Sequence, residues 1–118
     1  MPSLFGKKLS VEQIDTIVNA KMSWILNSCS PLKIIIFGSA ATYEMTDASD
    51  VDIIVILGLS EDRNLVSESL NRTRLKDDWP HDLFLYSNDA FEASCRKGGG
   101  ICWVARQEGK IIYSKEVP

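Results

Sequence analysis

Residues 32–57 read LKIIIFGSAATYEMTDASDVDIIVIL, and this stretch decides the fold. Residues 34–37 and 53–57 are short runs of β-branched, aliphatic and aromatic residues, and a glycine closes each run. Runs of this kind are typical of strands that are buried on both faces of a sheet. We therefore predict strands over residues 32–37 and 51–57, with a short helix leaving the first strand at residues 39–43.

The segments on either side of this stretch also alternate between helical and strand patterns. Ser10 and Gln13 have the spacing of a capping box, and apolar residues then recur every three or four positions to about residue 27, which predicts a helix. Another helix is expected to begin at Ser60, with an apolar stripe of Leu65, Val66, Leu70 and Leu75. The remaining segments indicate a strand over 82–86, a helix capped by Ser87 or Asn88, a helix over 101–107 and a strand over 110–114.

Helices that interleave with strands in this order predict an α+β fold with α/β-like alternation. We expect a small mixed sheet of about four strands with helices packed against it. The chain has 118 residues, close to a common single-domain length, so one domain over residues 1–118 is expected.

Composition and charge narrow the possible partners. The formal net charge is −3 and the basic residues are scattered, whereas nucleic-acid binders usually carry a basic surplus or stripe. Free nucleic acid is therefore disfavoured as a partner.

The three cysteines show no metal-binding spacing and are expected to be free thiols. No apolar run reaches the ~20 residues that span a bilayer, and a cytoplasmic location is expected.

Acidic residues stand at the start of two predicted strands. Asp50 and Asp52 flank Val51, and side chains two residues apart on a strand point to the same face. Two close carboxylates raise each other's pKa unless a cation lies between them, and Mg²⁺ prefers such oxygen ligands. Asp82 opens the next strand, and its carboxylate joins the pair if the two strands are neighbours. Three acidic groups can hold two metal ions about 3.5–4 Å apart.

Gly38 and Ser39 follow directly on the first buried strand. A glycine there lets the backbone approach a ligand closely, and free backbone N–H groups with a serine hydroxyl favour an anion such as a triphosphate. Taken alone, a glycine that ends a strand is more often only a turn. His81, the single histidine, has no nucleophile implied beside it and is expected to be structural or incidental.

Taken together, these motifs resemble the signature of the DNA polymerase β-type nucleotidyltransferase superfamily. That signature joins Gly-Ser, here in Gly-Ser-Ala-Ala at 38–41, to Asp-x-Asp on a strand, here in Ser-Asp-Val-Asp-Ile-Ile-Val at 49–55. The nearest branch is the minimal nucleotidyltransferases, and the similarity runs from about residue 10 to residue 114, including the helix–turn–strand ending at 105–113.

The resemblance implies a nucleotidyltransferase fold and a role for each acidic residue. Asp50 and Asp52 would hold the nucleotide-bound Mg²⁺, and Asp82 would hold a second Mg²⁺ and help to deprotonate the attacking hydroxyl. Gly38 and Ser39 would cradle the triphosphate. The implied reaction transfers a nucleoside monophosphate, AMP from ATP, to a protein or small-molecule hydroxyl. Minimal nucleotidyltransferases also resemble antitoxins that modify HEPN toxins, so a HEPN-type protein is an implied partner.

One departure from the family pattern leaves an alternative open. Family members commonly carry Arg-Gly where this chain has Thr42-Tyr43. Loss of the arginine removes a phosphate contact, and Tyr43 is expected to restrict the loop to ordinary backbone angles. The alternative is a catalytically weak or inactive module that binds a nucleotide or a partner with the same fold.

Overall fold

The computed structural model describes residues 6–76 and 78–115, and its elements follow the predicted order. Five helices and four strands are present in this part of the chain. They are α1 (Val11–Ser28), β1 (Lys33–Phe37), α2 (Ser39–Thr42), β2 (Val51–Leu57), α3 (Arg63–Thr73), β3 (His81–Ser87), α4 (Asn88–Lys97), α5 (Gly100–Glu108) and β4 (Lys110–Ser114).

The four strands form one mixed sheet in the order β3-β2-β1-β4. β1 runs antiparallel to both of its neighbours, β2 and β4, whereas β2 and β3 are parallel. The parallel pair needs a crossover, and α3 supplies it. The prediction of an α+β fold with a four-stranded mixed sheet is confirmed.

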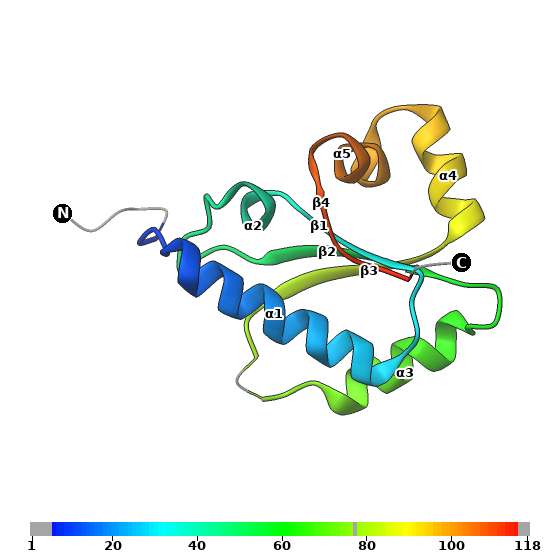
Figure 1. The fold of residues 1–118 in the computed structure, drawn as a ribbon, viewed down its shortest axis with the longest axis horizontal. Helices are drawn as coiled ribbons and strands as arrows, with labels where there is room; N and C mark the ends of the chain where they lie inside the picture. Colours follow the sequence, from blue (N-terminus) through cyan, green and yellow to red (C-terminus); the bar gives the residue numbers. More distant parts are fainter. Residues whose placement is uncertain (1–5, 77, 116–118) are drawn as a thin grey trace.

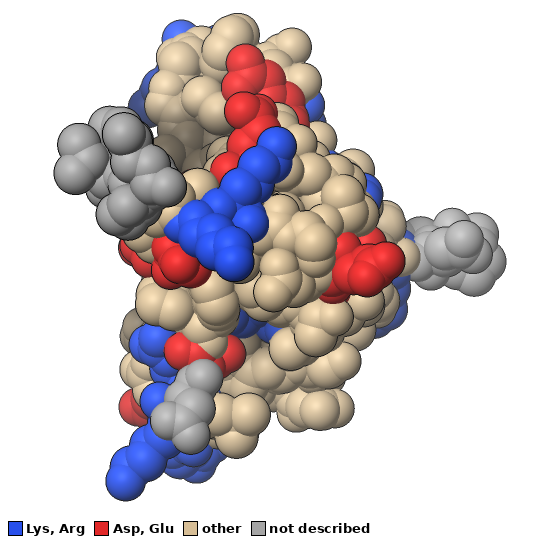
Figure 2. All heavy atoms as spheres, turned by 90° about the vertical axis from the view of Figure 1, so that its left-hand side faces the viewer, with Lys and Arg blue, Asp and Glu red and all other residues tan. Residues whose placement is uncertain are grey.

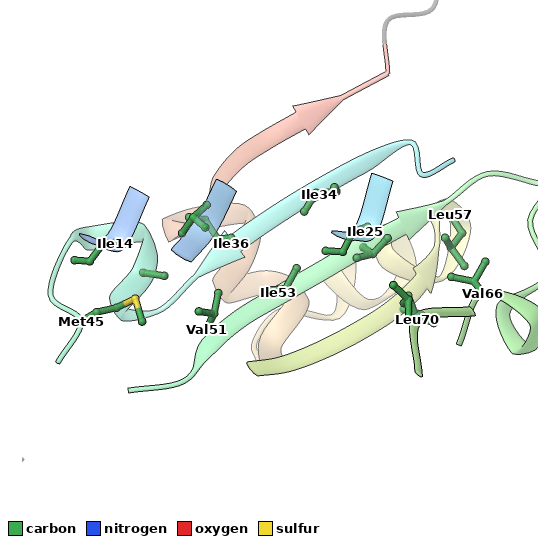
Figure 3. Close-up of a cluster of buried hydrophobic side chains, with 14 residues drawn as sticks. Ile14, Ile25, Ile34, Ile36, Met45, Val51, Ile53, Leu57, Val66 and Leu70 are labelled. Atoms are coloured by element: carbon green, nitrogen blue, oxygen red, sulfur yellow. The ribbon is translucent and has the colours of Figure 1, made fainter. Parts of the chain in front are cut away.

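Helices cover both faces of the sheet, but not equally (Figure 1). α1 and α3 pack on one face, and α4 and α5 pack on the opposite face towards one end. α2 lies at the other end, above the start of β2. Figure 3 shows the core between the sheet and α1 with α3. Its labelled side chains are Ile14, Ile25, Ile34, Ile36, Met45, Val51, Ile53, Leu57, Val66 and Leu70.

Side chains alternate between the two faces of the sheet along β2, and this alternation shows on which face Asp52 lies. Val51, Ile53 and Val55 belong to the core beneath α1 and α3, and Ile54 and Ile56 belong to the second core, beneath α4 and α5. Asp52 therefore lies on the same face as α4 and α5. It stands at the end of that face beside α2, because it is the second residue of β2.

Local sequence signals explain most helix ends, with one error. Ser10 and Gln13 form the predicted capping box of α1, and Ser87 caps α4. The prediction that Ser60 caps α3 is wrong: the cap is Asp62, whose side chain accepts hydrogen bonds from the backbone of Asn64 and Leu65. The predicted apolar stripe is also partly wrong, since Val66 and Leu70 are buried but Leu65 is 64% exposed and Leu75 is 75% exposed.

The three cysteines are free thiols, as predicted, and two of them lie in the core. Cys29, Cys95 and Cys102 are free thiols, and the last two are buried. Burial raises the pKa of the Cys29 thiol to about 11, which makes it a poor nucleophile.

Among the described residues, no helix combines the length and the apolar character that a membrane span requires.

Candidate active site

Asp52 and Asp82 are direct neighbours across the parallel β2–β3 pair. Their Cα atoms are register partners, so both side chains leave the sheet on the same face. The sequence predicted this meeting only on the condition that the two strands were adjacent, and the sheet order meets that condition. The carboxylate of Asp52 is half-buried, and that of Asp82 is exposed.

The surroundings of Asp52 disfavour its negative charge. Burial raises the pKa of the Asp52 carboxyl above its ordinary value, and the negative charges of Asp82 and Asp50 raise it further. A side-chain hydrogen bond with Asp82 acts in the same direction. A cation placed between the two carboxylates would remove this penalty, because it would compensate both charges at once.

Asp50 takes part in the site from a different position. It precedes β2 by one residue, is exposed, and contributes its charge to the environment of Asp52. Across residues 6–76 and 78–115, no three acidic, histidine or cysteine side chains already form a metal-binding group. The donor chemistry nevertheless fits a divalent cation, since Mg²⁺ is typically held by one or two protein carboxylates together with substrate phosphates.

At Gly38, the turn after β1 lies against the side chain of Asp52. It has φ 67° and ψ −149°, which favours glycine. A Cβ atom at this position would lie 2.6 Å from Oδ2 of Asp52, so a side chain here would collide with the carboxylate. Gly38 and Ser39 also line a hollow of about 420 Å³, together with Thr42, Glu44 and Glu108. The predicted glycine–serine turn and the predicted carboxylate therefore meet in one place.

The hollow beside Gly38 is acidic. Its charged lining residues within the described ranges are Glu44 and Glu108, and no basic side chain accompanies them there. Figure 2 shows the end of the molecule that carries α2, where Lys and Arg side chains lie in separate groups among acidic ones. Since a triphosphate is strongly anionic, this lining would favour it only when a cation binds with it.

The expectation that Tyr43 restricts the loop to ordinary backbone angles is wrong. It adopts the left-handed conformation, φ 60° and ψ 32°, and ends α2, so the loop takes a shape that glycine normally supplies. Its hydroxyl donates to Oδ1 of Asp15 on α1 at 2.8 Å. The ammonium group of Lys110 on β4 lies 5.3 Å from the ring centroid and donates to the hydroxyl at 3.4 Å. Tyr43 thus fastens α2 to α1 and β4.

A buried lysine close to the start of β3 was not predicted from the sequence. Lys21 on α1 is 1% exposed, and its ammonium group contacts Asp78 at 2.6 Å and Nδ1 of His81 at 2.7 Å. It also donates to the carbonyl of Trp79. Burial lowers the pKa of Lys21, while Asp78 partly offsets that effect. The network fixes the chain just before Asp82, and His81 has the structural role that was predicted.

A signal for Lys21 was present in the sequence. Ile14, Val18, Lys21 and Ile25 form one stripe at helical spacing, and all four are buried. A lysine in such a stripe must find an acidic or polar partner, because an unpaired buried charge is strongly unfavourable. The partner could not be named in advance, since Asp78 is distant along the chain.

Comparison with known proteins agrees with these features. Residues 20–117 match the family model described as polymerase beta, nucleotidyltransferase. Among solved structures, the chain is similar to the crystal structure of a Sulfolobus solfataricus protein assigned provisionally to the nucleotidyltransferases. The TM-score is 0.55 at 14% identity, and the match covers 89% of this chain and 84% of that one, a likeness that concerns the fold. None of the curated proteins compared with the chain matches it.

Proposed function

The chain belongs to the polymerase beta nucleotidyltransferase family, and from this premise we propose that it transfers AMP from ATP to a hydroxyl group of a protein or small-molecule acceptor. The observation that carries the proposal is the in-register pairing of Asp52 with Asp82 directly beside Gly38. A HEPN-type protein is the partner that the resemblance to minimal nucleotidyltransferases suggests.

The carboxylates would act as ligands and as a proton acceptor. Asp50 and Asp52 would hold the nucleotide-bound Mg²⁺, and Asp82 would hold the second ion. A bound divalent cation would neutralise triphosphate charge and stabilise the charge that develops on the transferred phosphoryl group. Asp82 is the more exposed member of the pair, so an acceptor can reach it from solvent.

The chemical step would be a single displacement at phosphorus. The acceptor oxygen attacks the α-phosphorus, the bond to the β-phosphate oxygen breaks, and pyrophosphate leaves. The hydroxyl proton passes to the Asp82 carboxylate. Gly38 and Ser39 would hold the triphosphate, with backbone and hydroxyl donors, against the Asp52 side of the site. Catalysis of this kind depends mainly on positioning and charge stabilisation.

Radiolabelled ATP tests the proposal directly. The protein is incubated with Mg²⁺ and [α-³²P]ATP, with candidate acceptors present, and label transfer and pyrophosphate release are measured. We expect both to fall at least a hundredfold in Asp52→Asn and Asp82→Asn, whereas Asp89→Asn, a change to an exposed carboxylate on α4, retains them. Equal activity in all three variants would rule out this site.

The acidic hollow supports a second candidate function, a binding module without turnover. Glu44 and Glu108 replace the basic lining that a triphosphate would favour, and Thr42 replaces the family's arginine. Calorimetric titration with Mg²⁺ and a non-hydrolysable ATP analogue separates the two functions. Nucleotide or partner binding without label transfer would favour the module, and transfer would favour the enzyme.

A further inference from the structure

We propose that the outer edge of β3 is the acceptor site of this enzyme. An extended protein segment would pair with β3 as a fifth strand and present a serine, threonine or tyrosine hydroxyl to Asp82. This inference rests on the proposed function and gives its acceptor a chemical class. It depends on the edge position of β3, on a hollow beside that edge, and on the place of Asp82 within the strand.

Within the described residues, β3 has a neighbouring strand on one side only. The sheet ends at β3, and the Val51 backbone N–H donates to the Pro80 carbonyl in the parallel pair with β2. In a parallel pair every second residue bonds to the same neighbour, so Asp82, Phe84 and Tyr86 face β2. The N–H and C=O groups of Leu83 and Leu85 point outwards, and in the described part of the chain they have no backbone partner there. Such a row is a template for another strand.

A hollow of about 640 Å³ accompanies this edge. It extends along β3 from His81 to Tyr86, and α3 forms its opposite wall. The residues that α3 contributes are mostly polar and exposed: Arg63, Asn64, Ser67 and Asn71. Side-chain amides, a hydroxyl and one guanidinium group suit polar and acidic side chains of an extended segment. A single arginine on this wall is too little for a polynucleotide, whose backbone needs several cationic contacts.

Strand pairing would deliver a hydroxyl to the carboxylates. Side chains of an added strand alternate between faces, so one set would enter the hollow and the other would share the face of Asp82. A residue directly opposite Asp82 would have its Cβ atom about 4.5–5.5 Å from that of Asp82. Its oxygen would form the new bond to the α-phosphorus, its proton would pass to Asp82, and pyrophosphate would leave with the electrons of the broken bond.

The first experiment measures binding without nucleotide, so its result does not depend on catalysis. An array of synthetic nonapeptides, each with one central serine, threonine or tyrosine and flanks of β-branched and acidic residues, is probed with fluorescently labelled protein. The strongest binder is then added in a residue-resolved hydrogen-exchange measurement by NMR. We expect the Leu83 and Leu85 amides to become at least tenfold more protected, while the Asp82 and Phe84 amides, already bonded to β2, change little.

Matched variants on α3 then test the hollow. Ser67→Trp fills it, and Glu68→Trp places the same side chain on the adjacent exposed position outside the lining. We expect Ser67→Trp to weaken peptide binding at least tenfold and Glu68→Trp to retain it, with thermal unfolding of both variants measured to establish the fold. Equal binding by the two folded variants would overturn the proposal.

Acceptor choice completes the test. Peptides, a panel of hexoses and aminoglycosides, and a short RNA are offered together with Mg²⁺ and [α-³²P]ATP. Label on the peptides supports the proposal. Label on the sugars or the RNA, or the absence of any peptide that protects Leu83 and Leu85, overturns it. If a peptide protects the Leu83 and Leu85 amides but no acceptor is labelled, peptide docking on β3 is supported and the proposed nucleotide transfer is refuted. The failure of the docking proposal and the failure of the proposed function are therefore distinguishable.

Discussion

A Cβ atom on residue 38 would lie 2.6 Å from Oδ2 of Asp52, so these two residues can stand together only because residue 38 is glycine. Two independent constraints meet at this point. The first is the contact with the carboxylate, and the second is the backbone conformation of φ 67° and ψ −149°. Conformations of this type cost other residues about 1–3 kcal/mol.

Gly38→Ala should lower the free energy of unfolding by about 1–3 kcal/mol and should also remove nucleotide transfer, because the new methyl group displaces Asp52. Urea denaturation and the label-transfer assay measure the two effects. Gly98→Ala is the matched control, since Gly98 has φ 72° but a Cβ atom there would meet no described atom within 4 Å. It should lose stability and keep its activity; equal loss of activity in both variants would contradict the role of the contact.

Tyr43→Phe should lower the free energy of unfolding by about 0.5–1.5 kcal/mol, because it removes the hydrogen bond to Asp15 and keeps the ring. A double-mutant cycle with Asp15→Ala, which removes the acceptor, isolates the pair when each variant is measured by urea denaturation. Asp15→Ala should lower the free energy of unfolding less in the Tyr43→Phe background than in the native chain. Additive effects would show that the hydroxyl does not fasten α2 to α1.

Lys21→Met should lower the free energy of unfolding by about 2–4 kcal/mol, since it removes the closest partner of the largely buried Asp78. Asp78 would keep only the longer contacts to Arg74 and His81, both at 3.8 Å. Lys97→Met, a change at an exposed position in the last turn of α4, is the control and should alter stability by less than about 0.5 kcal/mol. In the Asp78→Asn background the loss on Lys21→Met should shrink. A loss that is unchanged there would mean that the lysine stabilises the fold without this pair.

The pH dependence of stability should report the environment of Asp52. Its carboxyl has a raised pKa in the folded chain, so the folded state holds more protons than the unfolded state does. The contribution of this group to stability is therefore present below the ordinary value of 3.8 and is lost as the pH rises through the folded pKa.

Asp52→Asn removes this titration. Urea denaturation without divalent cations measures the effect. The native chain should lose stability relative to Asp52→Asn as the pH is raised from below the ordinary value of 3.8 through the folded pKa of Asp52 and on to neutral pH. A constant difference between the native chain and Asp52→Asn across that range would contradict the raised pKa.

The strands and their acidic ends were predictable because each depends on local pattern. The apolar runs identified β1 and β2, and the positions of Asp52 and Asp82 near the start of two strands implied a shared edge if those strands were parallel neighbours. Hydrophobic periodicity and side-chain alternation carry such information within a few residues. The α3 cap was missed because Ser60 and Asp62 are both capping types, and only the path of the chain selects Asp62.

Features that depend on distant partners were not predictable. The left-handed conformation of Tyr43 is held by Asp15 and Lys110, which come from α1 and β4. The exposure of Leu65 likewise follows from how α3 is rotated on the sheet. Neither relation can be read from residues that are close in sequence, since each arises only when separate elements pack.

The hydrogen bonds between β2 and β3 make one part of the candidate site more resistant to local unfolding than the other. Asp52 and Asp82 are carried by paired strands, whereas Asp50 and the turn at Gly38 lie just outside the strands. Local opening begins where backbone pairing is sparse. Transient fluctuations of the native protein would therefore release the turn at Gly38 and Asp50 first, and the two paired carboxylates of Asp52 and Asp82 would stay together until the strands separate.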